Sequence, residues 1–427
     1  MLSGEYCFAK NIFQDVQIEL KNFVVQKVNV EKKYSLKELT TLALQQNKNL
    51  EAALLEWKNA LHQVKVAKSW SNPEVMYSYF GTEVETRVGP QEQSFSLMQK
   101  MPFPGKLSTK GNVFYQKALQ KKSVYQHKKW MLLFEVENVF YEYVYLLNVI
   151  EVTAFNQKLL KDLERVAQIK YKSGITKTQD LLKVQVELGK IANDFTSLKD
   201  YQKVIVAQLK ALLNWPSNQT LRINTDTSQM NPLTEIPSIA KWEERSPELQ
   251  GLESAIKQGE SQKKLARLDY FPDFSFGVTY IDTNTRSVAV EDNGKDPLIA
   301  KVTVSLPIWF NKLKENKNAA DTWKDFQQSL YEDKKNIIKV QIETILYQIG
   351  DARRKIQLYK SALIPKAQQT LKIMTTNYQT SDASFLDLLD SQRLLLTFQT
   401  AHDRSYANYF QNVAKLRALI GGFHNES

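Results

Sequence analysis

One stretch of the sequence limits the possible folds more than any other. From Lys106 to Tyr171 the chain has no proline, and Gly111 is its only glycine. One continuous helix over this stretch would be about 100 Å long. A single globular domain cannot enclose such a helix, so the stretch predicts a helical hairpin that projects far from the rest of the chain.

The same order of elements is written twice along the chain. Each half has a helix that runs to a proline, two extended segments, a second proline and a long helical hairpin. We therefore predict two structural repeats, 34–215 and 239–422, joined by a linker over 216–238. An N-terminal arm over 1–33, in part disordered, and a short tail over 423–427 flank them.

The extended segments alternate between apolar and polar residues, as strands with two different faces do. Phe274, Phe276 and Val278 alternate with Asp273, Ser275 and Gly277. A half-buried sheet in a soluble protein and a membrane-spanning sheet both give this pattern. We expect strands at about 74–84, 93–102, 273–283 and 299–308.

The strand count favours a membrane assembly of several chains. Each strand has about ten residues, which suits a tilted membrane strand. Four strands cannot close a barrel, and open edges cannot face lipid. The long projecting hairpins favour a membrane assembly over a soluble sheet. In such an assembly, several chains would have to pool their strands to close one barrel.

Pro365 lies inside the second long helical stretch. Proline removes one backbone hydrogen bond, so we expect a kink or local unwinding there. A bend where a helical assembly tapers and a simple helix break explain it equally well.

The residue types for covalent chemistry are scarce. The chain has one cysteine and four scattered histidines, and no phosphate-binding glycine loop or nucleophile motif. We therefore expect no enzyme activity, no cofactor and no metal site. The net charge of +11 leaves open a second function, a soluble basic coiled coil that binds nucleic acid or acidic partners. Against it, the lysines are interleaved with acidic residues along the helices.

The sequence resembles the TolC-type outer membrane efflux proteins, which are the outer-membrane factors of tripartite efflux pumps. The resemblance rests on three stretches: Asn72-Pro73, the PFPGK-like stretch within 96–106, and the run from Tyr378 to Asp390. It implies a mainly α-helical fold with membrane β-strands. In a homotrimer, each chain would supply four strands to a 12-stranded outer-membrane β-barrel, and the helical hairpins would form an α-barrel in the periplasm.

The resemblance also implies function and partners. The chain would be the exit duct that passes substrates from an inner-membrane pump, of the RND type, and a periplasmic adaptor to the exterior. The cargo would be heavy-metal cations or small toxic compounds. Outer-membrane lipid would be a partner and nucleic acid would not. Residues 1–10 lack the basic and apolar regions of a signal peptide, which taken alone predicts a cytoplasmic protein and conflicts with this localisation.

The resemblance places candidate site residues at the two hairpin tips, about 172–177 and 379–384. Matching the tip motif assigns two pore-facing aspartate rings to Asp387 and Asp390, a gating tyrosine to Tyr378, and an aspartate of a closing link to Asp180. Three carboxylates that converge in a narrow neck would favour passing cations. Acidic residues near a helix start also complement the helix dipole without any pore. Adaptor docking is expected at the exposed tips, on Gly174, Ile175, Thr176, Ser381, Asp382 and Ala383.

The tip motif departs from the family pattern in one important place. The arginine expected five residues after the tip tyrosine is replaced by Ala383. The link to Asp180 therefore cannot be transferred, and Lys177 and Arg393 are the candidate substitutes.

Overall fold

A computed structural model describes residues 14, 16–21, 23, 29–174, 178–226, 232, 239–287, 290–380 and 382–423. The chain divides into two compact units. Unit 1 draws its residues from 1–54, 124–247 and 334–427, and unit 2 consists of 55–123 and 248–333. Most of the predicted arm over 1–33, residues 227–231 and 233–238 of the linker, and all but the first residue of the tail lie outside the described residues.

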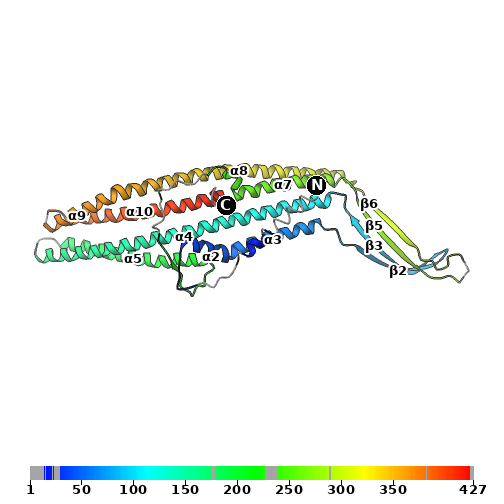
Figure 1. Cartoon of the computed structure of the whole chain (residues 1–427), viewed down its shortest axis with the longest axis horizontal. Helices are drawn as coiled ribbons and strands as arrows, with labels where there is room; N and C mark the ends of the chain where they lie inside the picture. Colours follow the sequence, from blue (N-terminus) through cyan, green and yellow to red (C-terminus); the bar gives the residue numbers. More distant parts are fainter. Residues whose placement is uncertain are drawn as a thin grey trace. The chain divides into compact units, whose positions relative to one another are not determined.

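Long helices dominate the chain, so the expectation of a mainly helical fold is confirmed (Figure 1). In the first half they are α2 (Leu36–Gln46), α3 (Lys48–Lys68), α4 (Lys106–Lys172) and α5 (Thr178–Leu212). The second half has the four-residue helix α6 (Trp242–Arg245), followed by α7 (Pro247–Leu268), α8 (Phe310–Leu358), α9 (Ile364–Thr380) and α10 (Phe385–Ile420). No helix of the described residues is both long and apolar enough to cross a membrane.

The helix signals in the sequence act locally. Ser35 caps α2 in a capping box with Glu38, whose carboxylate accepts from the Ser35 backbone N–H at 2.9 Å. Helix α4 runs without interruption through its 67 residues. Its one glycine, Gly111, lies where the Lys68 side chain of α3 packs on α4. A Cβ atom there would come within 2.3 Å of Lys68 Cγ, so a larger residue would force the Lys68 side chain to move.

Local unwinding near Pro365 is confirmed. A π-helical turn, η1 (Tyr359–Leu363), separates α8 from α9, and the Ile364 backbone N–H donates to the carbonyl of Tyr359, five residues back. Proline cannot donate to the carbonyl of Ser361, and the wider turn absorbs this missing hydrogen bond.

Four antiparallel strands form the sheet of unit 2, in the order β2-β3-β5-β6. They are β2 (Glu74–Thr86), β3 (Gly89–Met101), β5 (Asp273–Thr283) and β6 (Leu298–Ser305). Strand β3 begins four residues earlier than expected because the β2–β3 turn is tight, with Gly89 at φ +136°. Strand β6 ends three residues earlier than expected, two residues before Pro307, which cannot donate a ladder hydrogen bond. In unit 1, β1 (Lys33–Tyr34) pairs in parallel with β4 (Arg222–Ile223).

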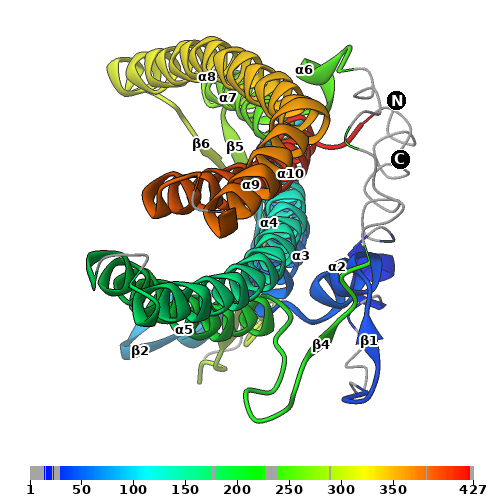
Figure 2. The ribbon, with the colours of Figure 1, turned by 90° about the vertical axis from the view of Figure 1, so that its left-hand side faces the viewer.

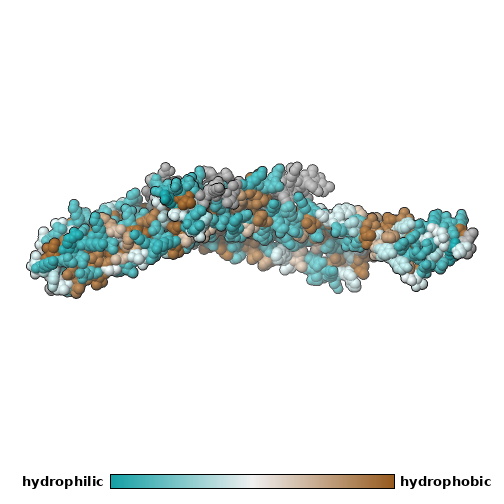
Figure 3. All heavy atoms as spheres, turned by 90° about the horizontal axis from the view of Figure 1, so that it is seen from below, coloured by the Kyte–Doolittle hydropathy of each residue, from teal (hydrophilic) through white to brown (hydrophobic). Residues whose placement is uncertain are grey.

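The register gives the sheet one apolar and one polar face. Tyr77 pairs with Phe95 and Phe95 with Tyr280, while Phe276 pairs with Val302, and residues paired across strands share a face. The opposite face carries hydroxyl pairs such as Ser96 and Thr279, whose side-chain oxygens lie 2.8 Å apart. Apolar side chains on the first face are exposed, and Figure 3 shows a brown band over the strands. The exposed members of this face are Val75, Tyr77, Tyr79, Phe95, Leu97, Phe276, Val278, Tyr280, Leu298, Val302 and Val304.

Candidate functional site at the hairpin tips

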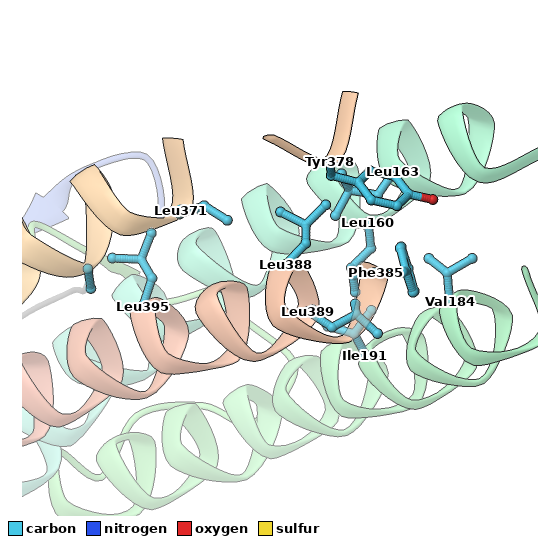
Figure 4. Close-up of a cluster of buried hydrophobic side chains, with 11 residues drawn as sticks. Leu160, Leu163, Val184, Ile191, Leu371, Tyr378, Phe385, Leu388, Leu389 and Leu395 are labelled. Atoms are coloured by element: carbon cyan, nitrogen blue, oxygen red, sulfur yellow. The ribbon is translucent and has the colours of Figure 1, made fainter. Parts of the chain in front are cut away.

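In unit 1, two helical hairpins pack side by side near their tips. Hairpin 1 consists of α4 and α5, and hairpin 2 consists of α9 and α10 (Figures 1 and 2). Their shared core contains apolar side chains from all four helices, drawn in Figure 4. This core places the two tips next to each other within one chain. Its members are Leu160, Leu163, Val184, Ile191, Ala367, Leu371, Tyr378, Phe385, Leu388, Leu389 and Leu395.

Tyr378 lies inside this core. Its side chain is 4% exposed, and its ring packs against Phe385 with centroids 5.5 Å apart. Lys170 of hairpin 1 donates to the Tyr378 backbone carbonyl, and the Lys170 ammonium lies 4.5 Å from the centre of the Tyr378 ring. A cation over an aromatic face is favourable, so the two tips are linked at this residue. The gating role of Tyr378 stays a prediction.

The two predicted ring aspartates lie at the start of α10, and both are exposed. Ser384 caps the helix, because its hydroxyl accepts from the Asp387 N–H at 3.2 Å and donates to the Asp387 carboxylate at 2.7 Å. The Asp390 carboxylate lies 3.3 Å from Arg393 and its side chain is 70% exposed. Asp387 therefore takes part in the cap of α10, and its pore-facing role stays a prediction.

Arg393 links the two hairpins, but to a different partner from the one expected. Its guanidinium forms an ion pair with Glu187 of α5 as well as with Asp390. The hydrogen bond that Arg393 donates to the Glu187 carboxylate raises the pKa of Arg393 above its ordinary value. Since Glu187 lies two helical turns after Asp180, the link joins α10 to α5 further from the tip than the family pattern places it.

A buried polar pair adds a second link between the hairpins. Gln392 of α10 donates from its side-chain amide to the side-chain oxygen of Asn156 on α4 at 2.8 Å. Both side chains are almost fully buried. A buried amide without its partner would lose stabilisation, so this pair fixes the register of α10 on α4.

The predicted docking residues form the two turns. Gly174 has φ +71°, and its N–H donates to the carbonyl of Tyr171 at 3.0 Å. In the second tip, the N–H groups of Asp382 and Ala383 both donate to the carbonyl of Asn377, at 2.8 and 3.3 Å. Ile175, Thr176 and Ser381, and the candidate substitute Lys177, lie outside the described residues.

Sequence reasoning missed Lys170 and Glu187 as site residues. Neither belongs to a motif, and each contacts a residue more than 200 positions away. A charged residue within about three helical turns of a predicted tip was the only available signal. Among the described residues, no group of three or more histidines, cysteines and acidic side chains is arranged to hold a metal ion.

Comparison with known proteins identifies the class. Residues 239–422 match the family model of the outer membrane efflux proteins. Three solved structures have the same fold over almost the whole chain. CusC is 14% identical with a TM-score of 0.79, covering 94% of this chain and 96% of its own. VceC from Vibrio cholerae is 17% identical with a TM-score of 0.75, covering 91% and 97%. CmeC from Campylobacter jejuni is 17% identical with a TM-score of 0.71, covering 92% and 87%.

The resemblance found in the sequence is thus confirmed. The chain has the fold of the TolC-type channels, and its residues 239–422 match the family model of the outer membrane efflux proteins. No protein with a curated function matches the sequence significantly. At 14–17% identity the solved structures establish the fold alone.

Proposed function

We propose that this chain is the outer-membrane exit duct of a tripartite efflux system. Three copies would pool their strands into a 12-stranded barrel in the outer membrane, and their hairpins would form a helical duct in the periplasm. An adaptor and an inner-membrane pump of the RND type would deliver heavy-metal cations or small toxic compounds to it.

The observation that carries this proposal is the two-faced sheet. One face is apolar and exposed, the other carries hydroxyls and amides, and the outer edges of β2 and β6 pair with no strand of the described residues. Lipid on the apolar side and water on the polar side satisfy both faces. Pairing of β2 with β6 of the next copy satisfies both edges, since no unpaired edge can lie in lipid.

Exposed apolar residues on helix α8 support the assembly of several copies through their helices. Its exposed apolar residues repeat at spacings of three, four and seven, which places them on one side of the helix. Such a seam on a monomer is typical of a surface that another helix covers. We call these residues the α8 seam: Trp323, Phe326, Leu330, Ile337, Val340 and Tyr347.

The tips fit a gated entrance. Asp387 and Asp390 are exposed beside a core that holds the two hairpins together. In a trimer, three copies of each carboxylate would surround one axis and would favour the passage of cations. Adaptor docking would use the turns at Gly174 and at Asp382-Ala383.

Membrane fractionation of cells that express the chain tests the proposal. We expect the protein in the outer-membrane fraction, as a trimer that survives mild detergent and conducts ions in planar bilayers. A soluble monomer that binds bulk DNA in a salt-sensitive way would instead support the basic coiled-coil function.

A further inference from the structure

Basic side chains are concentrated at the four helix ends that meet the sheet of unit 2. Four segments of eleven residues contain eleven lysines and arginines and only two acidic residues, Glu260 and Glu315. Their formal net charge is +9, compared with +11 for the whole chain. We call these segments the basic collar: 58–68 at the end of α3, 106–116 at the start of α4, 258–268 at the end of α7 and 310–320 at the start of α8.

The topology brings the four segments to one end of the sheet. Helices α3 and α7 lead into β2 and β5, whereas α4 and α8 follow β3 and β6. Because neighbouring strands are antiparallel, all four helix–strand connections lie at the same end (Figure 1). None of the connections is longer than five residues, so the charges lie close to the sheet.

Among the described residues, most collar cations form no salt bridge. Lys106 pairs with Asp273 at 2.8 Å, and Lys263 pairs with Asp321 at 2.5 Å. Within the described part of the chain, eight others have no carboxylate within salt-bridge distance: Lys58, Lys68, Lys110, Lys264, Arg267, Lys312, Lys314 and Lys317. At longer range, Asp321 attracts Arg267 and Lys317, and Asp269 attracts Lys312. Gathered like charges repel one another, so an external anion would stabilise this arrangement.

Exposed aromatic residues separate the collar from the apolar sheet face. Trp70, Tyr270, Phe271, Trp309 and Phe310 lie in or next to the helix–strand connections, and all are exposed. Tryptophan and tyrosine prefer the headgroup level of a membrane. Lysine and arginine just beyond them lie at the depth of lipid phosphates, with their aliphatic stems against apolar surface.

We infer that the basic collar binds the headgroups of anionic phospholipids in the leaflet nearest the helices. The inference rests on the proposed function, because only a membrane-inserted sheet brings the collar to the headgroups. Charge complementarity selects an anionic lipid such as phosphatidylglycerol over a zwitterionic one. The collar would thereby fix the depth at which the sheet sits in the membrane.

Quenching of tryptophan fluorescence by brominated lipids tests the inference, because Trp70 and Trp309 lie beside the collar. The whole protein is reconstituted into vesicles that mix phosphatidylcholine with phosphatidylglycerol, with one lipid brominated at a time. We expect a preference for phosphatidylglycerol of about threefold, which decreases at high salt. The collar variant combines Lys110→Gln, Lys264→Gln, Lys312→Gln and Lys314→Gln, and its preference should fall close to one.

A matched control removes four exposed lysines from the helices of unit 1 by Lys161→Gln, Lys190→Gln, Lys339→Gln and Lys372→Gln, and it should keep the preference. Channel current is recorded from the same preparations. Normal current without a lipid preference, or an equal preference in both variants, overturns the collar alone. If the collar variant has altered ion selectivity and unchanged lipid preference, the lysines line the duct. That result also overturns the inference about the collar. A chain that does not insert overturns the proposed function as well.

Discussion

At the scale of single residues, the tip of hairpin 2 combines exposed carboxylates with buried links to hairpin 1. Asp387 and Asp390 are exposed, while Tyr378, Gln392 and Arg393 attach α9 and α10 to the first hairpin. The links hold the carboxylates in position relative to hairpin 1. Neutralising the carboxylates should therefore change ion passage without loosening the tip.

Asp387→Asn combined with Asp390→Asn is expected to lower the cation preference of the channel several-fold. An amide oxygen at position 387 can still accept from the Ser384 hydroxyl, so the change mainly removes charge. The ratio of cation to anion permeability in planar bilayers measures the effect. Asp162→Asn combined with Asp200→Asn, two exposed acids elsewhere on hairpin 1, is the control. An unaltered ratio in the tip variant would reject the ring assignment.

A second residue-scale prediction concerns the pair of Glu142 on α4 and Arg404 on α10. Arg404 donates two hydrogen bonds to the Glu142 carboxylate, at 2.6 and 2.8 Å, and its guanidinium stacks on Tyr145. These hydrogen bonds hold the pKa of Glu142 below its ordinary value. The resulting stabilisation is complete above the unfolded pKa of glutamate, about 4.3, and is lost as the pH falls through the lower folded pKa.

Glu142→Gln should thus cost about 2 kcal/mol of unfolding free energy at neutral pH. The difference from the parent protein should shrink below about pH 4, because the parent loses the same charge there. Thermal unfolding followed over pH 3 to 7 measures both effects. Glu151→Gln, an exposed change on the same helix, is the control and should be nearly neutral. A difference that stays constant over this pH range would contradict the prediction.

At the scale of elements, the sheet faces are distinguished only by the alternation along each strand. Val302 and Thr303 are neighbours on β6 and point to opposite faces, one apolar and one polar. Val302→Arg should destabilise the inserted state by about 3 kcal/mol, and Thr303→Arg should cost much less because water can reach it.

The yield of folded protein in outer-membrane fractions, and its resistance to urea, would distinguish the two variants. The two substitutions introduce the same side chain at adjacent positions of one strand, so each controls for the other. Equal losses in both variants would mean that the two faces meet the same environment, which is incompatible with a membrane-spanning sheet.

At the scale of the whole molecule, a single copy of the chain exposes surfaces that stable monomeric proteins usually cover. The apolar face of the sheet, its two unpaired edges and the α8 seam all belong to this class. The proposed homotrimer in a membrane would account for all three together, since lipid would cover the face and neighbouring copies would cover the edges and the seam.

Val340→Asp on the α8 seam is expected to weaken the trimer, because its side chain is 66% exposed in one chain and would be buried between copies. A larger monomer fraction in detergent, seen by size-exclusion chromatography with light scattering, would report the effect. Lys339→Asp changes the adjacent exposed residue off the seam and should leave the trimer intact. Loss of the trimer in both variants would count against the seam as the contact surface.

The sequence by itself determined the elements. Scarce glycine and proline dictated the long helices, period-two alternation dictated the strands, and Pro365 dictated the local unwinding. These properties depend on the backbone and on neighbouring residues, so they can be inferred along the chain. The positions of Tyr378, Asp387 and Asp390 at a hairpin tip were predicted from the resemblance of the tip motif to the family.

Only the tertiary structure decided which elements became neighbours. It placed β3 next to β5 and so joined the two halves in one two-faced sheet. It paired Arg393 with Glu187 and Lys170 with Tyr378, and it gathered most of the net charge at one end of the sheet. Such contacts depend on the register of helices and strands against each other. Packing between side chains that are far apart in the sequence sets that register, so the register cannot be derived from local propensity.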